Sequence, residues 1–145
     1  DIVSPSSSEY VINKRNTVLI SAKTTLRERW QEVTEAMGRT GAREMYLETI
    51  DNTISQEVIE TLNDANIQVV TTYSIKEANY KKYLSVISIE NLLVILKETV
   101  EKWKNFTYTE EVKNEIRLNL EKQLSKHQQH TFVKEYYERQ INKFL

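Results

Sequence analysis

The 145-residue chain contains no cysteine, which excludes disulfide bonds and zinc sites built on cysteine. Only one proline and two glycines are present, so the composition favours long regular elements with few breaks. The chain has no run of 18 apolar residues, and we therefore expect no membrane span. Its first five residues have neither a basic start nor an apolar stretch, which excludes a secretory signal at that position.

Positive and negative charges nearly cancel, with 20 Lys and Arg against 21 Asp and Glu. Charged residues make up 28% of the chain, a share that argues against disorder when the net charge is only −1. Without a basic excess, a surface for nucleic acid would have to arise from local placement of cations. The length suits one compact domain. Because the chain begins with Asp rather than Met, we expect a processed chain or a fragment.

The first half of the chain alternates strand-like and helix-like patterns. A strand is predicted over residues 18–23, and its period of two places Ser21 and Lys23 on the same side. Further strands are predicted at residues 2–3, 44–49 and 67–72. This order predicts an α/β domain with a short mixed sheet flanked by helices, followed by a helical C-terminal portion.

Helices are predicted from their caps and apolar stripes. Thr25-x-x-Glu28 has the form of a capping box, and Gly38 is the expected stop of that helix. The stripe on it comprises Leu26, Trp30, Val33 and Met37. Other helices are predicted at residues 55–65, 109–125 and 132–144. A second capping box, Ser74-x-x-Glu77, predicts a helix start at Ser74. A further helix is predicted to begin at Ser88, with apolar positions 89, 93, 96, 100 and 103. We expect these stripes to form core or subunit interface.

Three features of this pattern suit phosphodiester hydrolysis. That reaction needs a hard cation, carboxylates that hold it, and a group that orients or helps to deprotonate water. Asp1, Lys23 and an acid from the helix after Lys23 would supply these functions. On spacing alone, however, a chain terminus at Asp1 and a solvated strand end at Lys23 are the simpler interpretation.

Residues 21–30, Ser-Ala-Lys-Thr-Thr-Leu-Arg-Glu-Arg-Trp, resemble a signature of type II restriction endonucleases in the PD-(D/E)XK superfamily. The similar branch cuts CCGG, CCNGG and CCWGG sites. There, S-x-K-T-T precedes a basic–acidic–Arg triplet and a Trp, and the following helix supplies the carboxylate that the strand lacks. The stretch Asp1-Ile2-Val3 with Pro5 is similar to the PD-containing strand of the family. The resemblance covers roughly residues 1–103.

The resemblance implies a Mg²⁺-dependent endonuclease that acts on double-stranded DNA at a GC-rich palindrome. It implies that Asp1 is a catalytic and metal-binding residue and that Lys23 is the catalytic lysine. Ser21 and Thr24 are implied as supporting residues. A palindromic target further implies a twofold-symmetric homodimer. We expect the protein in the cytoplasm of a bacterium or archaeon, without a membrane partner.

The resemblance also implies that Arg27, Glu28 and Arg29 read bases. Arginine can donate two hydrogen bonds to guanine O6 and N7, and a carboxylate can accept one from cytosine N4. Without the resemblance, Glu28 is explained by the capping box and the two arginines by a solvated helix face.

The acid on the helix departs from the family pattern. The family places it near residue 36, where this chain has Ala36. Glu35 is the first choice as catalytic residue and metal ligand, if the helix is shifted by one position. Glu32 is the alternative, because it lies one turn before Ala36 on the same face. A third interpretation is an engineered inactive form with Ala36 in place of the acid.

Two segments are predicted. Residues 1–104 form the catalytic core, with its N-terminal part expected to be missing, and residues 105–145 form a helical extension and a candidate dimer interface. His127 and His130 have the spacing of a metal pair but no evident third ligand, so a surface linker is favoured. Two other functions remain open: a catalytically inactive DNA-binding module of the same fold, and a helical protein–protein interaction domain.

Overall fold

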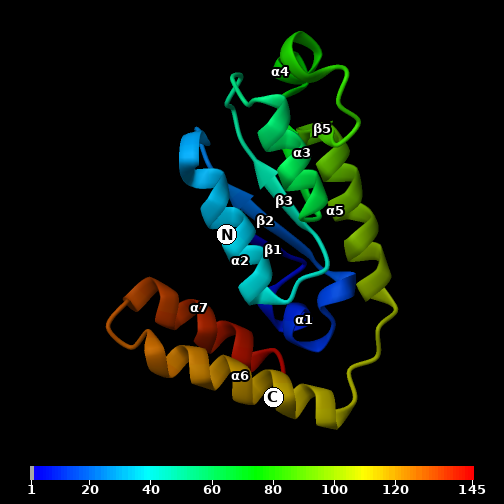
Figure 1. The fold of residues 1–145 in the computed structure, drawn as a ribbon. Coiled ribbons are helices and arrows are strands. Elements are labelled where there is room, and N and C mark those ends of the chain that lie inside the picture. The colour runs from blue at the N-terminus through cyan, green and yellow to red at the C-terminus, as the bar shows by residue number, and fades with distance from the viewer. Residues whose placement is uncertain (1) are drawn as a thin grey trace.

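The computed structural model describes residues 2–145 and is built on a five-stranded mixed sheet (Figure 1). The strands follow one another across the sheet in chain order. The first strand is antiparallel to the second, and the remaining neighbours are parallel. The strands are β1 (Ile2–Ser4), β2 (Val18–Ala22), β3 (Met45–Glu48), β4 (Ile67–Thr71) and β5 (Val86–Ser88). The prediction of a mixed sheet is confirmed, although β5 was not predicted from the sequence.

Helices cover both faces of the sheet. Helices α2 (Trp30–Thr40) and α3 (Gln56–Asp64) lie on one face, and α5 (Ile89–Lys104) lies on the other (Figure 1). The other helices are α1 (Ser7–Ile12), α4 (Tyr73–Ile75), α6 (Glu110–Lys126) and α7 (Thr131–Asn142). None of the helices described over residues 2–145 is long and apolar enough to cross a lipid bilayer.

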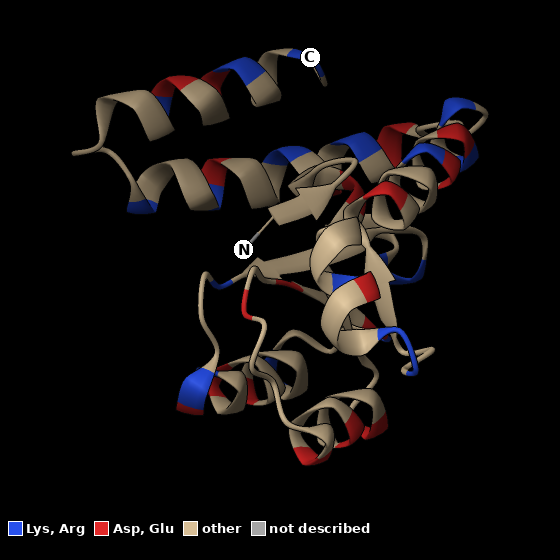
Figure 2. Ribbon diagram, turned by 90° about the horizontal axis from the view of Figure 1, so that it is seen from above, with Lys and Arg blue, Asp and Glu red and all other residues tan. Residues whose placement is uncertain are grey.

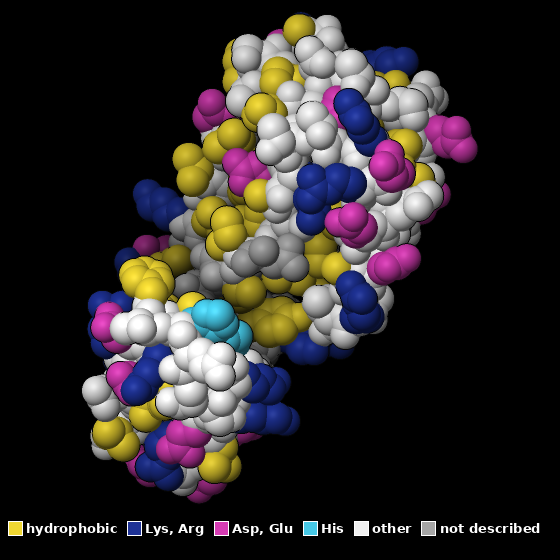
Figure 3. All heavy atoms as spheres, turned by 90° about the vertical axis from the view of Figure 1, so that its left-hand side faces the viewer, with side chains coloured by type: hydrophobic (Ala, Val, Ile, Leu, Met, Phe, Trp, Pro, Cys, Tyr) yellow, Lys and Arg dark blue, Asp and Glu magenta, His cyan; other side chains and the backbone are white. Residues whose placement is uncertain are grey.

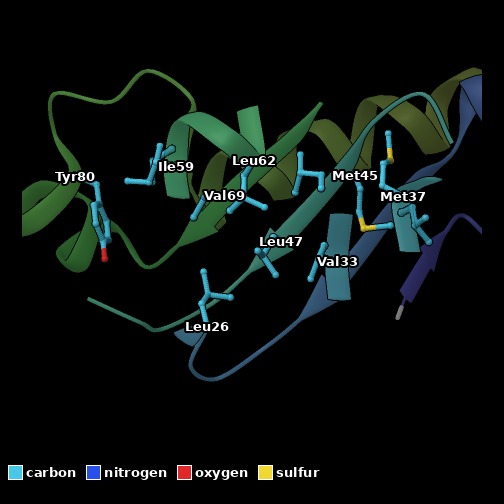
Figure 4. Packing of buried hydrophobic residues seen from close by; sticks show 12 residues of the cluster. Leu26, Val33, Met37, Met45, Leu47, Ile59, Leu62, Val69 and Tyr80 are labelled. Carbon is cyan, nitrogen blue, oxygen red and sulfur yellow. The ribbon is translucent and has the colours of Figure 1, made fainter. Parts of the chain in front are cut away.

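Strand β2 carries the predicted alternation of side chains. Leu19 packs into the core on the side of α2 and α3. Val18 and Ile20 pack on the side of α5. Both faces are therefore buried, as parallel strands between two helical layers require. Figure 4 shows the core on the α2 and α3 side, where Leu26 and Val33 surround the β3 residue Leu47.

The predicted boundaries of α2 are wrong at both ends. Residues 27–29 form a short 3-10 turn, and α2 begins at Trp30 without a side-chain cap, so the Thr25-x-x-Glu28 capping box does not form. Gly38 lies inside the helix. The terminator is Gly41, whose φ of +61° belongs to the left-handed region that ends many helices.

Two further helix predictions need correction. The capping residue near position 74 is Thr72, which accepts a hydrogen bond from the Ile75 N–H. On α5, Ile89, Leu96 and Trp103 lie on the buried side as predicted, whereas Leu93 and Val100 are 58% and 39% exposed. The buried residues of this helix are Leu92, Thr99 and Trp103. The capping box that opens it at Ser88 is present, with Asn91 as its second member.

Helices α6 and α7 form a hairpin that packs along α1 at one end of the molecule (Figure 1). Ile116 and Leu120 of α6 are buried, whereas α7 has no buried residue. Tyr108 donates a hydrogen bond of 2.6 Å to Glu9 of α1, and burial together with this carboxylate raises the pKa of the Tyr108 hydroxyl. In Figure 3, hydrophobic side chains gather at the waist between the sheet-bearing body and this hairpin.

Candidate active site

Lys23 follows the last residue of β2 and stays within the sheet edge. Its backbone N–H donates to the Glu48 carbonyl at 2.9 Å, which continues the ladder between β2 and β3. The side chain is 21% exposed, and its Nζ lies 3.5 Å from Glu32 Oε2 on α2. The structure thus brings the predicted catalytic lysine to one of the two acids considered from the sequence.

The acids of α2 differ in their surroundings. Glu32 is 60% exposed and also lies 4.0 Å from Arg29 Nε. Glu35 is exposed, and within residues 2–145 it makes no hydrogen bond or ion pair. Ala36 is half-buried and packs against the core. Among these positions, only Glu32 presents a carboxylate to Lys23.

Asp1 lies outside the described residues. Its chain neighbour Ile2 pairs with Ile20 of β2, three positions before Lys23. Ser21 is buried with 3% exposure, whereas Thr24 is exposed and its carbonyl accepts a hydrogen bond from the Thr49 hydroxyl at 3.3 Å.

A shallow cleft of about 260 Å³ opens at this edge of the sheet. Its walls come from the ends of β2 and β3 and the segments after them, and comprise Ala22, Lys23, Thr24, Glu48, Thr49 and Ile50. Because Lys23 lines the cleft and Glu32 pairs with Lys23, a ligand at this edge would meet both a cation and an anion.

The triplet Arg27, Glu28 and Arg29 forms an exposed 3-10 turn four residues after Lys23. Leu26, which precedes it, is 2% exposed and anchors the turn in the core. Its carbonyl accepts the Arg29 N–H at 2.6 Å. The three side chains of the triplet are therefore available at the surface, and Glu28 is not held as a helix cap.

The loop after β3 holds the segment before the triplet, a contact that was not predicted from the sequence. Asp51 Oδ2 accepts the Leu26 N–H at 2.8 Å, and Asp51 Oδ1 accepts the Thr53 N–H at 2.9 Å. An Asp-x-Thr sequence directly after a strand is a signal for such a turn, because Asp often bonds the backbone two residues on. Partial burial opposes ionisation of Asp51. The hydrogen bonds from Leu26 and Thr53 and the charge of Arg27 outweigh it, so the pKa of Asp51 is lowered.

Metal ligation within the described residues is limited. No group of three or more His, Cys, Asp or Glu side chains that could hold a metal occurs over residues 2–145. His127 and His130 flank the turn between α6 and α7, with ring centroids 6.1 Å apart, and the His127 ring stacks on Tyr137. Mg²⁺ is commonly held by one or two carboxylates, with water and phosphate oxygens completing its shell. The Glu32 carboxylate beside Lys23 fits that donor set in part.

Acidic and basic residues are interspersed along the helices in the view of Figure 2. Contact with a polyanion would therefore depend on local cations such as Lys23, Arg27 and Arg29 rather than on a broad basic field.

Comparisons with known proteins identify relatives of this chain. The family described as EcoRII C terminal matches residues 1–93. The type II restriction enzyme SsoII of Shigella sonnei is 46% identical over 142 residues, which are 98% of this chain and 47% of that enzyme. The structure of metal-depleted Ecl18kI in complex with uncleaved DNA has a TM-score of 0.77 and 46% identity, over 98% of this chain and 49% of that one.

A more distant structure shares the fold alone. The complex of restriction endonuclease PspGI with substrate DNA has a TM-score of 0.56 at 17% identity, over 69% of this chain and 46% of that one. This chain spans about half the length of each of these relatives.

Proposed function

Because the chain belongs to the EcoRII C-terminal family of type II restriction endonucleases, we propose that it cuts double-stranded DNA in a Mg²⁺-dependent reaction at a GC-rich palindrome of the CCGG or CCNGG type. The observation that carries this proposal is the ion pair of 3.5 Å between Lys23 and Glu32. It lies at the end of β2, four residues before an exposed Arg-Glu-Arg turn. Chemistry and base reading would then occupy neighbouring positions on one segment.

Lys23 is proposed as the catalytic lysine. Its ammonium lies at the wall of the cleft, where it can stabilise negative charge on a phosphoryl oxygen and orient the attacking water. A bound Mg²⁺ would neutralise charge on the phosphate and lower the pKa of a bound water. Asp1 and a helix carboxylate are proposed to hold this ion.

Glu32 is the helix carboxylate that we favour over Glu35. Glu32 pairs with Lys23, whereas Glu35 is exposed and has no partner among residues 2–145. On an α-helix, three residues correspond to a rotation of about 300°, so the two carboxylates leave the helix about 60° apart and one turn along its axis. The pairing of Glu32 with Lys23 supports the alternative assignment.

The reading of DNA is assigned to Arg27, Glu28 and Arg29. Two arginines and a glutamate on one exposed turn suit the acceptors of guanine and the amino group of cytosine in the major groove. Ecl18kI forms a complex with uncleaved DNA, which supports DNA as the partner of this chain. We expect binding to weaken with salt, because phosphate contacts release counterions.

A homodimer follows from a palindromic target, since a twofold-symmetric protein matches a twofold-symmetric site. Residues 105–145 are proposed as part of its interface. Leu118 on α6 and Phe132 on α7 are 64% and 78% exposed, which leaves apolar surface on the hairpin for a second copy to cover. We place the protein in the cytoplasm, where its DNA target lies.

The test combines cleavage with gel shift on short duplexes that carry CCGG, CCNGG or CCWGG. Wild type is expected to cut one of them in Mg²⁺ and to bind it without cutting in Ca²⁺. Lys23→Ala should cut about 100-fold more slowly or worse, the scale expected for loss of a catalytic proton-transfer or charge-stabilising group. Lys97→Ala, on the exposed side of α5, serves as the matched control. Absence of both binding and cutting by wild type would overturn the proposal.

A second candidate function is a catalytically inactive DNA-binding module of the same fold. Ala36, at the position where the resemblance places the acid, favours it. This candidate predicts specific binding without cutting in Mg²⁺. Under it, Ala36→Glu should create cutting activity, because the new carboxylate would lie one helical turn from Glu32 on the same face.

A further inference from the structure

The loop after β3 holds the segment before the Arg-Glu-Arg turn by hydrogen bonds at two positions. Asp51 Oδ2 accepts the Leu26 N–H at 2.8 Å. Two residues earlier in each segment, the Thr49 hydroxyl donates to the Thr24 carbonyl at 3.3 Å. The same hydroxyl accepts the Asp51 N–H at 3.1 Å, so a third hydrogen bond connects the two residues that hold the segment. The segment from Lys23 to Leu26 is therefore fastened to the neighbouring strand.

The carboxylate of Asp51 is itself held rigidly. Its Oδ1 accepts both the Thr53 N–H at 2.9 Å and the Thr53 hydroxyl at 2.7 Å. The Asp51 carbonyl accepts the Tyr80 hydroxyl at 3.0 Å, and that hydroxyl in turn accepts the Ile54 N–H at 2.9 Å. Tyr80 is 2% exposed and belongs to the core shown in Figure 4. Asp51 is thus tied through Tyr80 to the packed interior.

These hydrogen bonds affect the turn because its backbone conformation is strained. Arg27 has a φ of +39°, which a side chain with a Cβ adopts at a cost. The bond to Leu26 fixes the backbone immediately before that residue, and the buried Leu26 side chain fixes it a second time. The positive charge of Arg27 also favours the ionised form of the Asp51 carboxyl, and the two residues line one small pocket. The direction in which the turn presents its side chains therefore depends on Asp51.

We propose that Asp51 is a positioning residue that sets the conformation of the Arg27–Arg29 turn and, through it, the discrimination between DNA sequences. The part that concerns DNA rests on the proposed function of this turn. Asp51 would not touch DNA. By accepting a hydrogen bond from the Leu26 N–H, Asp51 orders the turn whose residues would contact DNA.

The first measurement needs no DNA. Trypsin cuts after Arg and Lys, and cleavage of a folded protein reports local opening of the backbone. Asp51→Asn is expected to raise the rate of cleavage after Arg27 and Arg29 about tenfold or more relative to cleavage after Lys126, as mass spectrometry would resolve. A tenfold change is the scale of losing one hydrogen bond to a charged group. The matched control is Asp64→Asn, which makes the same change at the exposed end of α3.

The second measurement uses the duplex that wild type prefers and duplexes altered at one base pair. Asp51→Asn is expected to reduce the ratio of their affinities about 10- to 100-fold, the discrimination that one bidentate base contact supplies. A purely structural role would lower the stability without changing this ratio in the folded fraction. Thr53→Ala is the second variant, since it removes the hydroxyl donor to Oδ1 but keeps the backbone N–H donor, and it should produce the same changes on a smaller scale.

The outcomes separate two failures. Trypsin rates at Arg27 and Arg29 that match those of Asp64→Asn overturn the positioning role of Asp51. Faster cleavage with an unchanged affinity ratio overturns its role in sequence discrimination. If wild type prefers none of the duplexes, the proposed function fails, and the trypsin rates still decide whether Asp51 holds the turn.

Discussion

Replacing Glu32 by Gln would decide which acid of α2 serves the catalytic site. The change keeps the size of the side chain and removes its charge. The pair with Lys23 has an N–O distance of 3.5 Å, and the two side chains are 21% and 60% exposed. Exposed ion pairs of this kind contribute at most about 1 kcal/mol to stability. We therefore expect the free energy of unfolding, measured with urea, to change by less than about 1 kcal/mol.

The expected effect on cleavage is much larger. A metal ion stabilises charge in the transition state by several kcal/mol, and a loss of about 3 kcal/mol corresponds to a rate about 100-fold lower. If Glu32 holds the ion, the Gln variant should show this loss in single-turnover cleavage with Mg²⁺ while its binding in Ca²⁺ is better preserved. The combination of a near-normal stability with a 100-fold loss of rate distinguishes a site residue from a residue that only supports the fold.

The comparison variants are Glu35→Gln, the rival assignment, and Glu98→Gln, an exposed acid of α5 that serves as control. Cutting by the Glu32 variant at the wild-type rate would refute the reasoning from the ion pair. If the Glu35 variant alone lost activity, the metal ligand would be Glu35, and the pair of Glu32 with Lys23 would be a surface contact.

Three further predictions concern the fold and the loop after β3, all measured by urea denaturation. Gly38→Ala should stabilise the chain by about 0.5–1 kcal/mol, because Gly38 lies inside α2 with open space around a new Cβ. Gly41→Ala should destabilise the chain by about 1–2 kcal/mol, because the φ of Gly41 is +61°. If both variants changed the free energy of unfolding in the same direction, the helix boundaries would be contradicted. Tyr80→Phe should cost about 1–3 kcal/mol, because the partly buried N–H of Ile54 loses its acceptor. A change below about 0.5 kcal/mol would mean that water replaces the Tyr80 hydroxyl. The lowered pKa of Asp51 means that its stabilising contribution is present above an ordinary pKa of about 4 and is lost as the pH falls through the lowered value. The destabilisation caused by Asp51→Asn should therefore shrink below about pH 4, and a constant difference would contradict an ionised Asp51.

The local patterns predicted those parts of the fold that depend on neighbours in the chain. The alternation in β2, the start of a helix at Ser88 and the presence of α3 are all visible in short stretches, and the structure confirms them. The phase of α5 was not predictable in this way. Residues 92–96 are all apolar, so several faces fit the same stretch, and packing against the sheet selects the one that contains Leu92 rather than Leu93.

The start of α2 shows how a distant contact overrides a local motif. Thr25-x-x-Glu28 has the form of a capping box, yet the Leu26 N–H is bonded by Asp51, 25 residues further along the chain. That bond holds residues 24–26 outside the helix and moves its start to Trp30. A loop residue that follows another strand cannot be paired with this position by spacing alone. Spacing likewise left Glu35 and Glu32 both open as the helix acid, and the packing of α2 places Glu32 beside Lys23.

The same contact links the two parts of the proposed site. Lys23 is fixed by the ladder between β2 and β3, and the Arg-Glu-Arg turn is fixed by the loop that continues β3. Both therefore take their position from one strand edge, with only three residues between them. A chain that reads bases with one end of a short segment and cuts with the other needs a constant distance between the two ends. A flexible link would let the turn bind its bases while Lys23 missed the phosphate. Fastening both ends of the segment to β3 removes that freedom, so changes in residues 49–54 should impair recognition and cleavage together.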